Sequence, residues 1–291
     1  MDENNITLII ANTINTIFSN LFSSIDNSIY GILDDITFIN TDIINNSFLE
    51  KILGTSTSNG ILLICNSLII GFVLYYIVSL LFSHITLSNT SSPLPFIFKL
   101  IIYTIIMNFS LYICEYIIDI NSNISIAIRQ VGESLFNKNI CFSGLIQELN
   151  SVISIENENF NIFSIDGLIK SFITIGLFNL VLVYSFRYIM LKVLILLCPF
   201  AILTLINEKT SYFFKAWLKS FISLLFIQIF ISIILVLIFS LNLTAEDLFS
   251  KLLLIGSIYT LIKANSFVRE LIGGISTDVG IGIRNLRSSI R

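Results

Sequence analysis

Charge is scarce in this sequence: Asp, Glu, Lys and Arg together make up 12% of its 291 residues, whereas soluble domains carry about 25%. Hydrophobic residues make up 55%, and the mean hydropathy is +0.91. A soluble domain of this composition would expose large apolar patches to water, which soluble monomers rarely do. The composition therefore excludes an ordinary soluble domain and predicts that much of the surface faces lipid.

Residues typical of metal and catalytic sites are also few. The chain has one histidine, His84, and four dispersed cysteines without CxxC spacing, so we expect no metal site and interpret the cysteines as buried thiols. No GxxxxGK[ST] loop, HExxH motif or Ser/His/Asp set is present, which argues against an NTPase or a hydrolase. We therefore expect no enzymatic activity, no catalytic residue and no cofactor.

Long apolar runs dominate the remaining sequence. Residues 60–82 contain no charge over 23 positions, which exceeds the roughly 20 residues that cross a bilayer. Pro93 and Pro95 precede a second apolar run at 96–118, and two further runs lie at 220–241 and 248–268. Each of these runs predicts a membrane-spanning helix.

The apolar stretch at 167–206 allows two interpretations. Forty residues of helix would measure about 60 Å, twice the hydrocarbon thickness of a bilayer. The stretch is either one very long helix or two spans joined by a tight turn at Arg187. Charge placement favours a single crossing, and hence five spans, because six spans place basic segments on the less favourable side.

The first 59 residues are amphipathic. Apolar residues recur at helical spacing with Asn and Ser between them, and they include Ile6, Leu8, Ile9, Ile14, Ile17, Phe18, Leu21, Phe22 and Ile25. Such a helix could pack on the rest of the protein or lie on the membrane surface. We favour packing, because surface helices usually carry Lys or Arg and the first basic residue here is Lys51.

These observations predict an all-α polytopic membrane protein with about five transmembrane helices, or six, preceded by an amphipathic region. We divide the chain into five parts: an amphipathic N-terminal region at 1–59, a first transmembrane hairpin at 60–118, an extramembrane loop with short helices at 119–166, a C-terminal transmembrane region at 167–272, and a basic, glycine-containing tail at 273–291.

The two ends of the chain differ in charge. Residues 1–186 hold 5 Lys and Arg against 14 Asp and Glu, whereas residues 187–291 hold 11 against 5. With five crossings, the positive-inside rule places the N-terminus outside and the C-terminus in the cytoplasm. The expected location is therefore a plasma membrane.

Four residues of the C-terminal region are candidates for structural or assembly roles. Arg187 and Lys192 lie inside an apolar stretch, where ionisable groups are costly and often functional; they could line a pore, contact a partner subunit, or simply extend to an interface. Pro199 could kink its helix and free a backbone carbonyl. Trp217 stands between Lys215 and Lys219 before a span, and we interpret it as a headgroup anchor.

The run RYIMLKVLILLCPFAILTLINEKTSYFFKAWLKSF, at 187–221, resembles the TrbL family of conjugal-transfer membrane proteins. In that family a long apolar stretch ends in Pro followed by an aromatic residue or Leu, and a short polar segment leads to a Trp before the next span. Pro199–Phe200, NEKTSYFF and Trp217–Leu218 fit this order. The later stretch SIYTLIKANSFVRELIGG also resembles the last helix of the family and its glycine-containing exit.

The resemblance implies a channel or scaffold subunit of a bacterial conjugation (type IV secretion) machine, with energy supplied by separate ATPases. Its expected partners are other secretion subunits, further copies of itself, membrane lipids and, transiently, the translocated DNA–protein substrate. A permease subunit of an ABC-type exporter, which would suit six crossings, and a membrane scaffold without transport activity are the alternatives. A membrane enzyme fits least, because convergent polar residues are nearly absent from the spans.

Overall fold

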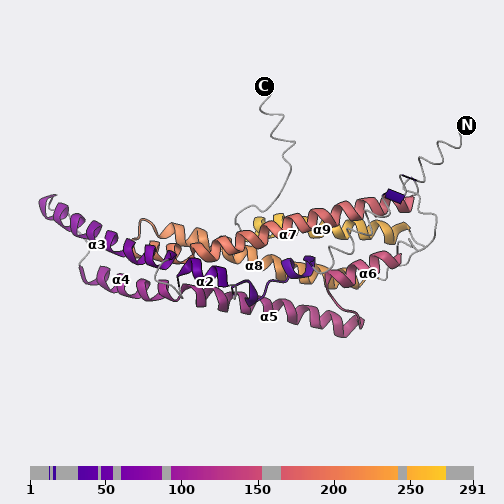
Figure 1. Ribbon diagram of the computed structural model, residues 1–291, viewed down its shortest axis with the longest axis horizontal. Helices are drawn as coiled ribbons and strands as arrows, with labels where there is room; N and C mark the ends of the chain where they lie inside the picture. Colours follow the sequence, from indigo (N-terminus) through magenta and orange to yellow (C-terminus); the bar gives the residue numbers. More distant parts are fainter. Residues whose placement is uncertain are drawn as a thin grey trace, which may run out of the picture.

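The computed structural model is an elongated bundle whose long helices run roughly along one axis (Figure 1). It describes residues 13, 16–17, 32–44, 47–54, 60–86, 93–152, 165–241 and 248–272. The structure is about 91% helical, without strands in its described part, which confirms the predicted all-α class. In chain order its elements are η1 (Thr41–Ile43), α2 (Ser47–Leu53), α3 (Ile61–Thr86), α4 (Pro93–Asn108), α5 (Ser110–Phe136), α6 (Phe142–Val152), α7 (Ile165–Leu203), η2 (Thr204–Ile206), α8 (Ser211–Phe239) and α9 (Leu248–Ile272).

Helices α3, α7, α8 and α9 are each long and apolar enough to cross a membrane. The bent pair α4–α5 adds a fifth crossing if the two helices are counted as one broken span. The chain is therefore a multi-pass helical membrane protein by the length and composition of its helices, as the apolar runs predict.

The second predicted span differs from the helix in the structure. The chain bends by 62° between α4 and α5, at Phe109, inside the run at 96–118 that was expected to form the second span. No proline lies at the bend; instead the Asn108 side chain donates to the Thr104 carbonyl at 2.9 Å, the kind of side-chain bond that competes with regular helix bonding. After the bend α5 continues to Phe136 and ends on Asn137, whose φ of 52° is left-handed, a common way for a helix to end. Residues 119–136, expected to belong to an extramembrane loop, are thus the second half of α5.

Helix α7 answers the question left open by the stretch at 167–206. It is continuous over 39 residues and passes through Arg187 without a break, so the alternative of two spans joined by a turn at that residue is wrong. At 1.5 Å per residue the helix is about 58 Å long. Pro199 lies inside it near its C-terminal end and removes one backbone donor from the helical ladder.

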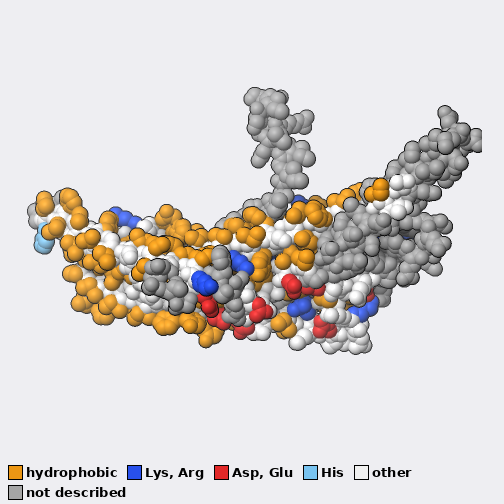
Figure 2. Space-filling view, viewed as in Figure 1, with side chains coloured by type: hydrophobic (Ala, Val, Ile, Leu, Met, Phe, Trp, Pro, Cys, Tyr) orange, Lys and Arg blue, Asp and Glu red, His pale blue; other side chains and the backbone are white. Residues whose placement is uncertain are grey.

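Helix α8 forms the centre of the bundle, and α3 forms its most exposed arm. In the most apolar window of α8, 61% of the residues are buried, against 6% in α3. Small side chains allow close packing around α8: Ser125 of α5 and Ser232 of α8 are buried, with their hydroxyl oxygens 2.6 Å apart. Hydrophobic side chains cover the end formed by α3 and α4, while charged side chains gather over α2 and α5 (Figure 2).

The described part of the N-terminal region packs against the bundle. Residues 32–44, here called the strap, bury Leu33, Ile39 and Ile43, and α2 buries Leu49 and Leu53. The helical pattern from Ile6 to Ile25 lies outside the described residues apart from Ile17, as does the tail at 273–291.

Candidate assembly site

Arg187 connects three separate parts of the fold. Its side chain is fully buried in α7. The guanidinium donates from Nε to the Leu224 carbonyl of α8 at 2.8 Å and from Nη1 to the Thr37 carbonyl of the strap at 2.9 Å. One side chain therefore joins α7, α8 and the N-terminal strap, so this residue neither reaches out to an interface nor lines an open path within one copy of the chain.

The strap has a second polar attachment one helical turn further along α8. The backbone N–H of Ile39 donates to Gln228 Oε1 at 3.1 Å, and Gln228 is completely buried. Because Gln228 follows Leu224 by four residues, the Ile39 bond and the Arg187 bond meet α8 on the same face. The strap is thus held through two backbone groups: the Thr37 carbonyl bonds Arg187 of α7, and the Ile39 N–H bonds Gln228 of α8.

Two further contacts hold the strap from α5 and α6. The Asp34 carboxylate accepts from the backbone N–H groups of Phe142 and Ser143 at 2.8 and 3.1 Å, in the first turn of α6, where a negative charge is stabilised by unpaired donors and by the helix dipole. The Arg129 guanidinium of α5 lies 3.9 Å from the centre of the Phe38 ring. These contacts extend the site to four helices.

The Arg187 guanidinium donates its hydrogen bonds to backbone carbonyls and not to a carboxylate. No Asp or Glu of the described chain forms an ion pair with it. Three nearby buried atoms lack a hydrogen-bond partner in the described structure: Arg187 Nη2, Gln228 Nε2 and Thr37 Oγ1. Such groups are costly to bury, so this position is specified by the strap contacts and not by apolar packing alone.

Lys192 and Pro199 do not join this site. Five residues of helix turn the chain by about 140° from Arg187 to Lys192, and Lys192 Nζ instead lies 4.6 Å from the centre of the Tyr188 ring. Pro199 is buried in the last turns of α7. Arg187, Lys192 and Pro199 therefore do not form one site, although all three belong to α7.

Trp217 is not the headgroup anchor that its flanking lysines suggested. Its side chain is only 5% exposed, its Nε1 donates to the Leu194 carbonyl of α7 at 2.8 Å, and its ring stacks on Phe221 with centroids 5.3 Å apart. A buried tryptophan normally finds a partner for its N–H, and here that partner is a backbone carbonyl five residues before Pro199. Trp217 ties the start of α8 to the second half of α7.

Several residues of this site were not identified from the sequence. Gln228 stands alone in the apolar run LLFIQIFIS, and an isolated amide within a span is a signal that could have been used. Tyr184, one turn before Arg187, donates its hydroxyl to the Leu261 carbonyl of α9 at 2.9 Å and gives no comparable signal. Thr37 and Asp34 act from a region whose position on the bundle the sequence leaves unspecified.

The described residues hold no group of three His, Cys, Asp or Glu side chains that could bind a metal ion, and the four cysteines are buried, as expected, and unpaired. What this arrangement can do is fix the strap and the α7–α8 pair in one geometry. Comparison of the chain with protein-family models, curated proteins and solved structures gives no match.

Proposed function

We propose that this chain is a channel or scaffold subunit of a bacterial conjugation (type IV secretion) machine. It would sit in the plasma membrane with its N-terminus outside and its C-terminus in the cytoplasm, and separate ATPases would supply energy. Its partners would be other secretion subunits, further copies of itself, lipids and, transiently, the DNA–protein substrate. The proposal starts from the resemblance at 187–221 and is supported by the packing of that segment and by the surface of α5.

The residues that carry the resemblance form one packed unit. The Trp217–Leu194 hydrogen bond joins the start of α8 to α7, and the Arg187–Leu224 bond joins the same two helices about two turns further into the hairpin. The order of apolar stretch, proline, polar turn and tryptophan therefore has a structural reason in this chain: it builds a tightly connected helical hairpin. A shared sequence pattern of this kind is what a common scaffold would require.

The surface of α5 is the observation that carries the proposal. Four polar residues lie within about 80° of one another around the helix: Glu115, Asp119, Asn123 and Gln130. Asp119, Asn123 and Gln130 are exposed and Glu115 is half-buried, although α5 belongs to the bent pair that is a candidate span. We call these four residues the α5 polar stripe.

A polar stripe on a membrane helix is costly where it meets lipid. Charged residues within spans usually face other protein or a water-filled cavity. An assembly in which the stripe lines an aqueous path, or meets another subunit, removes that cost. A channel or scaffold subunit fits this surface better than a solitary membrane protein does.

The exporter alternative has lost its main support. It depended on six crossings, obtained by splitting the stretch at 167–206, and α7 is one continuous helix. No further observation favours a permease, so we retain the conjugation subunit as the proposed function.

The proposal is tested by plasmid transfer. Donor cells lacking the gene are complemented with the wild-type chain or with an Asp119→Leu/Asn123→Leu variant, and transfer frequency is measured beside the level of the protein in the membrane. We expect the deletion to abolish transfer, and the double variant to reduce it at least tenfold at an unchanged membrane level. The matched control is Tyr116→Leu/Ile120→Leu, which alters the exposed apolar residues next to the stripe and should transfer normally. Normal transfer by the deletion strain would overturn the proposal.

A further inference from the structure

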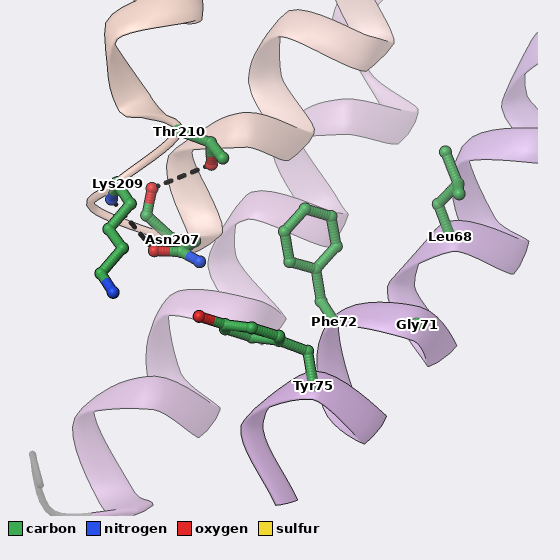
Figure 3. A pocket seen from close by; sticks show the side chains of 7 residues that line it. All are labelled: Leu68, Gly71, Phe72, Tyr75, Asn207, Lys209 and Thr210. Atoms are coloured by element: carbon green, nitrogen blue, oxygen red, sulfur yellow. Dashed lines mark hydrogen bonds between the residues drawn. The ribbon is translucent and has the colours of Figure 1, made fainter. Parts of the chain in front are cut away.

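A groove lies where α3 passes the connection between α7 and α8. Its volume is about 440 Å³, within the range of roughly 300–1,000 Å³ that small-molecule sites occupy. One wall is the exposed side of α3, from Leu68 to Tyr75, and the other is the polar turn at Asn207–Thr210. Figure 3 shows the two walls facing each other across the opening.

The polar wall presents donor groups of Asn207 and Lys209 that have no acceptor among the described residues. The Asn207 side-chain oxygen accepts from the Lys209 backbone N–H at 3.0 Å, which orients the amide so that its Nδ2 faces the groove (Figure 3). The Lys209 side chain is exposed and forms no ion pair with the described chain. Tyr75 reaches across from α3 with its hydroxyl on the same side as Lys209 (Figure 3). An ammonium, an amide N–H₂ and a phenol O–H therefore meet at one end of the groove.

The positive charge of Lys209 is not neutralised by its neighbour in sequence. Glu208 bonds instead to Lys99 of α4, with Lys99 Nζ 2.6 Å from Glu208 Oε1. The carboxylate that follows Asn207 in the turn is therefore already paired, and Lys209 forms no ion pair within the described part of the chain. Lys215 and Lys219 follow on α8, so this end of the bundle is basic.

The other end of the groove is apolar and has room for a ligand. Leu68 and Phe72 form its wall, and Gly71 lies between them with no atom within 4 Å of the position that a Cβ would take. From Leu68 to Tyr75 the groove extends about 10 Å along α3. It thus changes from apolar to cationic in the direction of the α7–α8 turn.

We propose that this groove binds an anionic phospholipid. The phosphate lies at Lys209, Asn207 Nδ2 and the Tyr75 hydroxyl, and an acyl chain runs along α3 over Gly71 toward Leu68. An amphiphile with an anionic head matches both ends of the groove, and basic residues attract anionic lipids. The proposal does not depend on a role in conjugation.

The test measures lipid retention by the purified full-length protein with native mass spectrometry. The protein is mixed in detergent with phosphatidylglycerol or phosphatidylcholine, and the fraction carrying lipid is followed during titration. We expect phosphatidylglycerol to be retained about fivefold better, which corresponds to the contribution of one lysine near an anionic headgroup. Equal retention of the two lipids would overturn the proposal.

Two matched pairs of variants locate the site. Lys209→Gln should remove the preference for phosphatidylglycerol, whereas Lys215→Gln, an exposed lysine at the same end, should keep it. Gly71→Leu should fill the groove and lower retention of both lipids, whereas Gly256→Leu, also in open space but on α9, should not. An equal effect of the two lysine variants would mean a diffuse basic surface and contradict the assignment.

Inorganic phosphate distinguishes a lipid site from a simple anion site. Sodium phosphate added at the concentration of the lipid should not displace phosphatidylglycerol, because phosphate lacks the acyl chain that occupies the apolar end. Efficient displacement would show that only an anion is recognised and would overturn the lipid assignment. Melting temperatures of all four variants, compared with the wild type, confirm that lost binding is not lost folding.

Discussion

Arg187 and Thr37 are 150 residues apart in the chain and 2.9 Å apart in the structure, joined by a hydrogen bond from the buried guanidinium to a backbone carbonyl. The same side chain bonds α8 through the Leu224 carbonyl. The arginine thus holds the N-terminal strap against the α7–α8 hairpin, whose two helices are also joined by the Trp217–Leu194 bond. Replacing Arg187 should therefore release the strap under conditions in which the helical bundle is still folded.

Arg187→Met should lower the free energy of unfolding by roughly 2–4 kcal/mol, because two hydrogen bonds from a charged donor are lost. Arg187→Lys should not restore it, since one ammonium cannot reproduce the forked geometry of a guanidinium. The measurement is the rate of chymotrypsin cleavage after Phe38, beside the melting temperature in detergent. Lys192→Met is the control, and cleavage of the Arg187 variants at the wild-type rate would contradict this role.

Trp217 offers a direct optical test, because it is the only tryptophan in the chain. Its burial between α7 and α8 predicts fluorescence at short wavelength, with weak quenching by acrylamide and by headgroup-level quenchers in vesicles. Trp217→Phe keeps the stacking on Phe221 and loses only the bond to Leu194, so it should cost about 1 kcal/mol. Strong quenching from the headgroup level would restore the interpretation as a membrane anchor.

The contrast between α3 and α5 shows what the sequence could predict. The uncharged run that became α3 predicts its helix directly, because length and hydropathy suffice for a span. The bend at Phe109 lies beside a side-chain bond from Asn108 to the Thr104 carbonyl, and no proline or glycine in the sequence indicates it. The environment of Trp217 was predicted wrongly, because an indole suits both a lipid headgroup region and a helix interface that offers a backbone carbonyl. The contacts of Arg187 and Gln228 with the strap could not be predicted from the sequence. They join residues that are far apart in the chain: Thr37 lies 150 positions from Arg187, and Ile39 lies 189 positions from Gln228.

The packing of α7 against α9 is tested at Gly176. A Cβ at this position would lie 2.6 Å from Ile258 Cγ2, whereas a Cβ at Gly256 of α9 would meet nothing within 4 Å. Both Gly→Ala changes gain about 1 kcal/mol of helix propensity, so the difference between them isolates the clash. We expect Gly176→Ala to be less stable than Gly256→Ala by about 1–3 kcal/mol. Combining Gly176→Ala with Ile258→Ala should abolish the clash; an unchanged penalty would place its origin elsewhere.

The ion pair of Lys99 with Glu208 predicts a dependence on pH. The hydrogen bond and positive charge of Lys99 lower the pKa of Glu208 below its usual value. A carboxylate with a lowered pKa contributes stability above its unfolded pKa, and this contribution is lost as the pH falls through the folded pKa. The difference in melting temperature between wild type and Lys99→Gln should therefore vanish at low pH. It should also shrink in high salt, because both side chains are exposed and surface pairs are screened. A difference that persists in acid would point to lost packing of the lysine stem.

Cysteine accessibility tests the crossing number together with the α5 polar stripe. The four native cysteines, although buried, are first replaced so that no native thiol can react. Single cysteines are then introduced at Ser151, Ser211 and Ser288. With five crossings, an impermeant maleimide added outside intact cells should label Ser151→Cys alone. Label at Ser211→Cys or Ser288→Cys would contradict the N-outside, C-inside arrangement. In the same background, Asn123→Cys should react with a water-soluble thiosulfonate and Ile120→Cys should not, because only the stripe would face water. Both positions are exposed in a single copy of the chain. Equal reactivity would therefore show that lipid does not cover the apolar side of α5. An unreactive Asn123→Cys would show that another subunit covers the α5 polar stripe and that no aqueous path runs along it.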